Sequence, residues 1–129
     1  MSMLDSLSRQ QLRVPWTLYA GDAHNIDATP GTDLVRTCPI NCKLTAVRAS
    51  AQAATSATQF IIEILRATTV VATLTSATPY VVGVVVASTN LDIRLSEGDV
   101  LTVRIRAVDA DGDDLFGLVV EAVLQPVID

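Results

Sequence analysis

Residues 91–108 read LDIRLSEGDVLTVRIRAV, two alternating apolar and polar segments joined by a polar turn. The apolar residues that share a face are Leu91, Ile93 and Leu95 before the turn, and Leu101, Val103, Ile105 and Ala107 after it. A period of two over this length is typical of half-buried antiparallel strands, and Gly98 gives the turn a residue that tolerates positive φ. The stretch therefore predicts an all-β protein. No reactive constellation accompanies it, which favours a scaffold over a catalyst.

Strand patterns of the same kind run along most of the chain. We expect further strands at residues 14–20, 33–38, 43–49, 58–66, 69–74, 80–87 and 115–124, and loops at 21–31, 50–57 and 75–79. Pro15 suits the first position of a strand or an edge strand. In strand 43–49, Leu44, Ala46 and Val47 compete for the core face, so its register stays open. About eight or nine strands, with turns roughly every 8–12 residues, indicate a sandwich or a barrel.

Two of these strands make specific predictions about the core. Strand 58–66 carries apolar residues on both faces, so it is either central and covered on both sides or meets another subunit. In strand 115–124, Glu121 faces outward and Pro126 ends the strand. The inward residues of that strand are expected to be Phe116, Leu118, Val120, Ala122 and Leu124.

The composition limits the kinds of partner. The 129 residues suffice for one domain with its own core; half are hydrophobic and only 4% are aromatic, which suits pleated, half-buried surfaces. The mean hydropathy of +0.42 indicates that some apolar surface is buried against another subunit. The net charge of −5, with Lys43 as the one lysine, argues against nucleic acid, which requires clustered basic residues.

Neither a membrane span nor a secretory signal is expected. The longest apolar run, residues 80–87 including Gly83, falls well short of the roughly 20 residues that a membrane-spanning helix needs. The N-terminus lacks the basic and apolar regions of a signal peptide.

Cys38 and Cys42 form a Cys-x-x-x-Cys pair. The pair cannot complete a four-ligand zinc site, because no second pair of Cys or His residues exists. Two small buried thiols are favoured in a chain without a secretion signal, and a local disulfide across the turn is the alternative.

Residues 1–13 differ from the rest, and we expect an N-terminal arm there, followed by a sandwich domain over residues 14–129. Leu4 and Leu7 have helical spacing, but an isolated helix of this length is marginal. The arm is either a frayed terminus or a segment that docks on a neighbour through these leucines.

Four stretches between residues 14 and 124 combine strand and turn motifs: PINCKLTAVRAS at 39–50, IIEILR at 61–66, LSEGDVLTV at 95–103 and GDDLFGLVV at 112–120. Taken in this order, they resemble the small jelly-roll domains of tailed-phage virion proteins. That family includes capsid decoration (cement) proteins, head fibres and parts of tail or baseplate proteins.

The resemblance implies an antiparallel jelly-roll β-sandwich of about eight strands, commonly assembled as a trimer. It implies a viral structural protein that is made in the host cytoplasm. As a homotrimer, the protein would bind the major capsid protein on the outside of the phage head and stabilise the head. An acidic surface suits such a particle. The alternative within the same family is a head-fibre, tail or baseplate module that binds a host receptor or glycan.

The acidic loop 109–114 is the chemically suggestive cluster. Asp109, Asp111 and Asp113 have the spacing of oxygen ligands for calcium. The EF-hand pattern fails, because Gly112 stands at position four and Val120 at position twelve. We therefore favour a solvated turn, in which Asp and Gly serve turn chemistry, and expect no metal and no cofactor.

The remaining candidates point to contacts rather than catalysis. His24 is the sole histidine and has no serine in a nucleophile context, so a surface histidine and no enzymatic activity are expected. Trp16 and Tyr19 are candidate interface anchors, because aromatic residues are enriched at binding hot spots. Trp16 could equally plug one end of the sandwich.

Deleting residues 1–13 tests whether the N-terminal segment is a docking arm. We expect the shortened chain to keep its β-sheet signal, because the strand pattern begins at Val14, but to bind phage heads more weakly. Far-ultraviolet circular dichroism reports the fold, and co-sedimentation with heads reports binding. Binding at full strength by the shortened chain would contradict the docking role.

Overall fold

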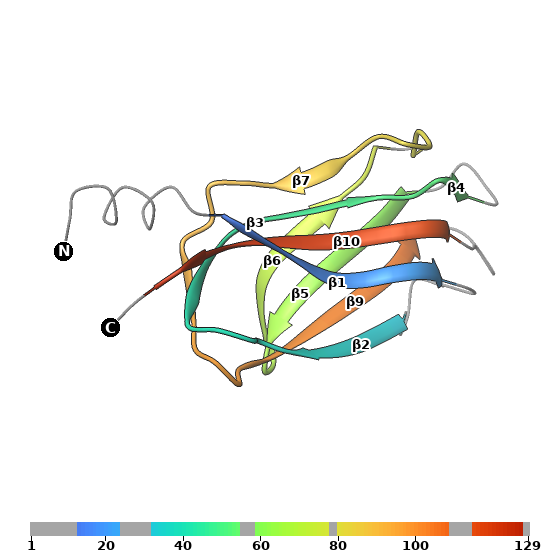
Figure 1. Cartoon of the computed structure of the whole chain (residues 1–129). Helices are drawn as coiled ribbons and strands as arrows, with labels where there is room; N and C mark the ends of the chain where they lie inside the picture. Colours follow the sequence, from blue (N-terminus) through green and yellow to red (C-terminus); the bar gives the residue numbers. More distant parts are fainter. Residues whose placement is uncertain (1–12, 24–31, 55–58, 78–79, 109–114, 128–129) are drawn as a thin grey trace.

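The computed structural model describes residues 13–23, 32–54, 59–77, 80–108 and 115–127, which form two antiparallel sheets stacked face to face (Figure 1). The first sheet contains, in order, β1 (Val14–Ala23), β10 (Leu115–Pro126), β3 (Cys42–Ser50) and β7 (Val86–Ser88), with β4 (Ala53–Ala54) paired to β10 and β8 (Ile93–Leu95) paired to β3. The second sheet contains, in order, β2 (Thr32–Thr37), β9 (Val100–Val108), β5 (Gln59–Arg66) and β6 (Thr69–Thr75). Within this described part, no helix is long and apolar enough to cross a membrane.

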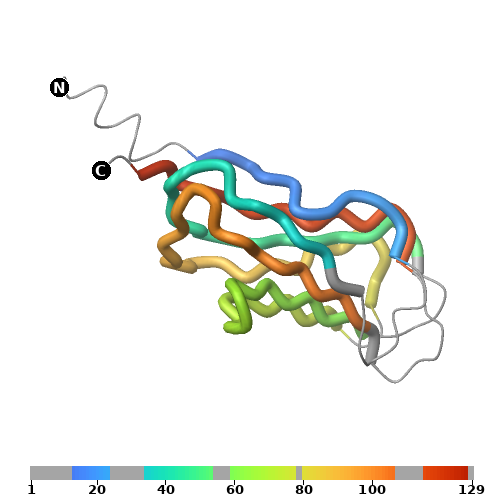
Figure 2. The backbone as a smooth tube through the Cα atoms, turned by 90° about the horizontal axis from the view of Figure 1, so that it is seen from below, coloured from blue at the N-terminus to red at the C-terminus, as the bar shows by residue number. Residues whose placement is uncertain are grey.

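The strand order is that of a jelly roll. Along the chain the main strands alternate between the two sheets, apart from the β5–β6 hairpin, and Figure 2 shows the resulting two layers edge-on. β7 and β8 both pair with β3 and together make one interrupted strand. With that strand counted once and the short β4 set aside, the predicted all-β sandwich of about eight strands is confirmed.

The stretch 91–108 forms strands, but these do not pair with each other. β8 belongs to the first sheet and β9 to the second, so the turn between them carries the chain across the sandwich. Gly98 has a φ of +92°, and the Asp99 amide donates to the Ser96 carbonyl at 3.0 Å. Leu95 and Leu101 are fully buried on opposite sides of the core.

The core is filled by the alternating residues that face the space between the sheets. Its completely buried members include Phe60, Ile62 and Ile64 from β5, Leu101, Val103 and Ile105 from β9, and Leu118, Val120, Ala122 and Leu124 from β10. β5 lies between β9 and β6, which confirms the predicted central position. Its outward residues Ile61 and Glu63 are only half-buried, so the predicted cover on both faces is not seen in the single chain, and a contact of this face with another subunit stays a prediction.

A bulge at Thr45 settles the register of β3. Leu44 pairs with Leu124 and Ala46 with Val123, so Thr45 is an extra residue on this strand. The bulge changes the phase of the alternation. Leu44 and Val47 are therefore both fully buried, although their spacing is odd, and Ala46 is half-buried.

The prediction that Phe116 faces inward is wrong. Phe116 is half-buried, and Leu115 occupies the core instead at 1% exposure. Gly117, with a φ of +60°, interrupts the alternation between Leu115 and Leu118. A Cβ atom at Gly117 would lie 2.8 Å from the Gln52 side-chain oxygen, so glycine also relieves a close approach.

Three predicted boundaries also change. β1 continues to Ala23 rather than ending at residue 20, and Ala53–Ala54 pairs with β10 inside the predicted loop 50–57. The predicted strand 80–87 contracts to β7, because the chain turns at residues 81–84, where Gly83 has a φ of +87° and the Val84 amide donates to the Val81 carbonyl at 3.1 Å.

Shortening Ile62 to alanine tests the central position of β5. The Ile62→Ala variant should lose about 2–5 kcal/mol of unfolding free energy, because a cavity would open in a closely packed core. Chemical denaturation measures the change. Val35→Ala is the matched control: Val35 is 63% exposed, and its loss should fall within about 0.5 kcal/mol. Equal losses in the two variants would contradict the assigned core.

Candidate functional site

Among the described residues, every large apolar side chain that remains exposed is a valine. These are Val35, Val70, Val81, Val82, Val84, Val85, Val100 and Val119, each between 42% and 63% exposed. Val119 lies opposite Ser50 on the first sheet, and Val81, Val82, Val84 and Val85 belong to the segment before β7 that bonds to Ala51 just after β3. We term these five valines the valine surface. Exposed apolar patches on soluble proteins commonly mark interaction sites.

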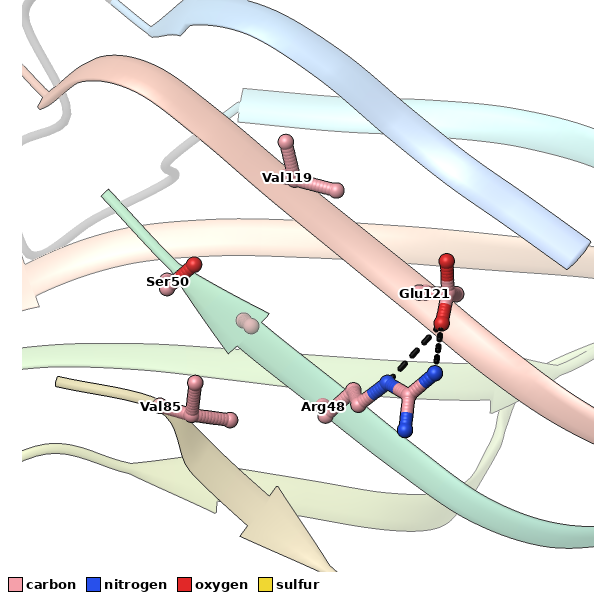
Figure 3. Close-up of a pocket in the computed structure, with 6 residues that line it drawn as sticks. Arg48, Ser50, Val85, Val119 and Glu121 are labelled. Atoms are coloured by element: carbon pink, nitrogen blue, oxygen red, sulfur yellow. Dashed lines mark hydrogen bonds and ion pairs between the residues drawn. The ribbon is translucent and has the colours of Figure 1, made fainter. Parts of the chain in front are cut away.

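A shallow hollow of about 120 Å³ lies within the valine surface (Figure 3). Val85 and Val119 flank it, and its other lining residues are Arg48, Ala49, Ser50 and Glu121. β3 and β10 pair side by side beneath it, with Ser50 opposite Val119 and Arg48 opposite Glu121. Their side chains therefore project from the outer face of the first sheet, away from the core.

An ion pair closes one side of the hollow. The Arg48 Nε donates to the Glu121 Oε1 at 2.8 Å, and a second guanidinium nitrogen contacts the same oxygen (Figure 3). The Arg48 side chain is 52% exposed and that of Glu121 is 23% exposed, so the pair adds at most about 1 kcal/mol to stability. The two charges offset each other, so the hollow carries no net charge.

Tyr80 fixes in place the turn at residues 81–84, which we term the valine turn. Its hydroxyl accepts a hydrogen bond from the Ala51 amide at 3.0 Å and donates one to the Val84 carbonyl at 2.8 Å. Its ring packs edge-on against Phe60 with 4.6 Å between ring centroids. The Gly83 amide also donates to the Ala51 carbonyl at 3.0 Å. The exposed valines are thus held by buried contacts.

A second, polar groove of about 550 Å³ lies on the same sheet towards the opposite end of β3. Its lining residues are Arg13, Lys43, Thr45, Ala46, Thr89, Asn90, Leu91, Asp92, Val123 and Gln125. The Lys43 Nζ lies 3.4 Å from the Asp92 Oδ1. Asn90 has a φ of +58°, and the Leu91 amide donates to the Thr45 carbonyl at 2.9 Å. None of these lining residues is aromatic.

The residues singled out from the sequence lie elsewhere. Trp16 and Tyr19 of β1 are partly buried and pack against the core, and neither lines the two hollows. The Tyr19 hydroxyl donates to the Asp22 carbonyl, and burial, followed by the charge of Asp22, raises the pKa of Tyr19. The predicted arm residues Leu4 and Leu7, the loop residues Asp109, Asp111 and Asp113, and His24 lie outside the described residues.

The sequence indicated that some apolar surface is buried against another subunit, but it did not single out these valines. The mean hydropathy of +0.42 is the general signal. The local signal is the valine-rich run 81–85 interrupted by Gly83, which reads equally well as a strand. These valines form an exposed surface only because the chain turns here and Tyr80 anchors that turn.

The sulfur and acidic residues give no metal centre in the described chain. Within residues 13–23, 32–54, 59–77, 80–108 and 115–127, no group of three or more His, Cys, Asp or Glu side chains could hold a metal ion. Cys38 and Cys42 are free and buried, as the sequence predicted.

No family model and no curated protein matches the sequence. Among solved structures, the chain is similar to the CBM36-1 domain of a multidomain xylanase from the hindgut metagenome of Trinervitermes trinervoides, with a TM-score of 0.50, 10% identity, and coverage of 86% of this chain and 96% of that one. It is also similar to the serine protease of Aeromonas sobria in complex with its chaperone, with a TM-score of 0.50, 9% identity, and coverage of 96% of this chain and 29% of that one.

A third similar structure is a β-glucosidase from Paenibacillus barengoltzii, with a TM-score of 0.40, 16% identity, and coverage of 78% of this chain. The chain spans only 10% of that enzyme's length. At 10% identity and a TM-score of 0.50, the similarity to the CBM36-1 domain supports the β-sandwich fold alone.

Replacing Tyr80 with phenylalanine tests whether its hydroxyl anchors the valine turn. The Tyr80→Phe variant should lose about 1–3 kcal/mol of unfolding free energy, because the buried Ala51 amide loses its acceptor. Tyr19→Phe is the matched control, since that hydroxyl is near the surface, and its loss should stay below about 1 kcal/mol. Denaturant titration measures both. An unchanged Tyr80→Phe variant would show that the turn is held by other contacts.

Proposed function

We propose that this protein is a structural component of a tailed-phage virion. It is a homotrimeric capsid decoration protein that binds the outside of the head and stabilises the head. Three features support the proposal. They are the jelly-roll strand order, the resemblance of its strand and turn motifs to phage virion domains, and the valine surface. The valine surface carries the proposal, because a protein that works as an assembly needs a surface for its own copies.

Charge favours self-association through the valine surface. Each chain carries a net charge of −5, so two copies repel one another over most orientations. Within the hollow, the Arg48 and Glu121 charges neutralise each other, and the flanking side chains are valines. Copies that meet there bury apolar surface without bringing like charges together, and we therefore assign the valine surface to contacts between copies.

A head-fibre, tail or baseplate module that binds a host receptor or glycan is the second candidate. The polar groove around Lys43, Asn90 and Asp92 favours it, because these side chains can form hydrogen bonds with sugar hydroxyls. The described lining contains no aromatic platform for sugar stacking. We therefore rank this candidate below the decoration protein.

Light scattering tests the contact between copies. The intact protein should have a solution mass of about 41 kDa, three times the chain mass of 13.7 kDa. The double variant Val85→Asp, Val119→Asp should shift to the monomer mass, because each contact would then bury unpaired carboxylates. Val35→Asp is the matched control: Val35 is 63% exposed on the second sheet, and this variant should keep the intact mass. A monomeric intact protein would contradict self-association, and an unchanged double variant would contradict the assigned surface.

Co-sedimentation tests the role in the virion. Heads of the phage that encodes the chain, purified without it, should bind the intact protein at a fixed ratio and should then resist heating better than bare heads. The monomeric double variant should bind more weakly, because it loses the gain from several linked contacts. Binding to host-cell glycans but not to heads would favour the second candidate.

A further inference from the structure

Two free thiols meet at the corner where the chain passes between the sheets. Cys38 directly follows β2 of the second sheet, and Cys42 begins β3 of the first. Their Sγ atoms lie 3.7 Å apart, and the two residues are 1% and 0% exposed. The Cys38 Sγ also donates to the Ile40 carbonyl at 3.2 Å. The turn between β2 and β3 therefore directs both side chains into one buried site.

Backbone hydrogen bonds hold this corner against the neighbouring crossover. The Cys38 amide donates to the Asp99 carbonyl at 2.7 Å, and the Gly98 amide donates to the Cys38 carbonyl at 2.9 Å. The Glu97 amide donates to the Asn41 Oδ1 at 2.8 Å, and the Asn41 carbonyl accepts from the Val127 amide at 3.0 Å. The β2–β3 and β8–β9 crossovers are thus joined beside the thiols, which keeps the two sulfurs facing each other.

We infer that Cys38 and Cys42 are a redox clip, two thiols that a small-molecule disulfide oxidises to an intramolecular disulfide that locks this corner. One thiolate attacks the oxidant and forms a mixed disulfide, releasing one oxidant thiol. The second thiolate then displaces the other oxidant thiol and completes the Cys38–Cys42 bond. The protein loses two electrons and two protons, and the oxidant gains both as its disulfide becomes two thiols.

Burial sets the rate at which the clip closes. Desolvation, followed by the hydrogen bond between the two thiols, raises the pKa of Cys42 to about 12, so little thiolate forms while the corner is closed. Thiolate is the attacking species, and closure must therefore wait for the corner to open locally. The thiols stay reduced in a reducing cytoplasm and can be oxidised in an oxidising environment.

The closed clip joins the end of a strand in the second sheet to the start of a strand in the first. It ties the two sheets covalently across a short turn, and restricting the unfolded chain in this way stabilises a folded protein. The two sulfurs must approach from 3.7 Å to the roughly 2 Å of a disulfide bond, a rearrangement within the corner itself.

Incubating the folded protein with oxidised glutathione tests the inference. We expect intact-mass spectrometry to show the slow loss of two hydrogen atoms, the loss of both alkylatable thiols, and a melting temperature roughly 5–10 °C higher. Amide hydrogen exchange at Cys38 and Gly98 should slow in the oxidised protein, because both amides bond within the corner. A reducing agent should reverse all of these changes.

Cys42→Ala is the control, since it leaves Cys38 without a partner. After the same treatment its melting temperature should not rise, and its mass should never fall by two hydrogen atoms. Three results would overturn the clip: thiols of the folded protein that stay alkylatable while those of the urea-unfolded chain oxidise, disulfide-linked dimers in place of the internal bond, or an oxidised protein that melts no higher than the reduced one.

Discussion

The burial of one face of each sheet against the other is the constraint on which the rest of this structure depends. Because each strand can bury only alternate residues, the inward set must line up across the whole sandwich. Where the sequence would put the wrong side chain inside, the backbone changes phase instead, at the Thr45 bulge and at Gly117. The outer faces have no such requirement. There the sequence places exposed valines, such as Val85 and Val119, where polar residues are expected.

β3 connects the thiol corner and the valine surface. Cys42 at its start forms the thiol corner, and Arg48 and Ser50 near its end line the hollow of the valine surface. Between them, Thr45 donates to the Val123 carbonyl at 3.0 Å, which fastens the bulge to β10. One strand thus carries the facing thiols at one end and part of the exposed valine surface at the other.

The sequence predicted those parts of the fold that depend on a period of two. Leu101, Val103 and Ile105 alternate without interruption, and all three are fully buried. The phase changes could not be predicted, because a bulge depends on the partner strand and a glycine reveals its positive φ only in three dimensions. For the same reason Phe116 was expected inside, and Leu115 lies there instead.

The candidate site was less predictable than the fold. A run of valines has no periodicity that separates a strand from an exposed turn, and the anchor that decides between them, Tyr80, bonds to Ala51, 29 positions away in the sequence. Trp16 and Tyr19 were chosen for their aromatic character, yet they pack partly against the core. Their role as interface anchors stays a prediction.

Methyl NMR of the assembled protein with a soluble paramagnetic agent tests whether the valine surface is the contact between copies, because it measures the exposure of every valine in one sample. We expect Val85 and Val119 to be shielded from the agent, whereas Val35, Val70 and Val100 stay as accessible as their exposures of 63%, 44% and 47% require. If the agent attenuates the methyl signals of all these valines in proportion to their exposure in the single chain, the valine surface is not the contact between copies.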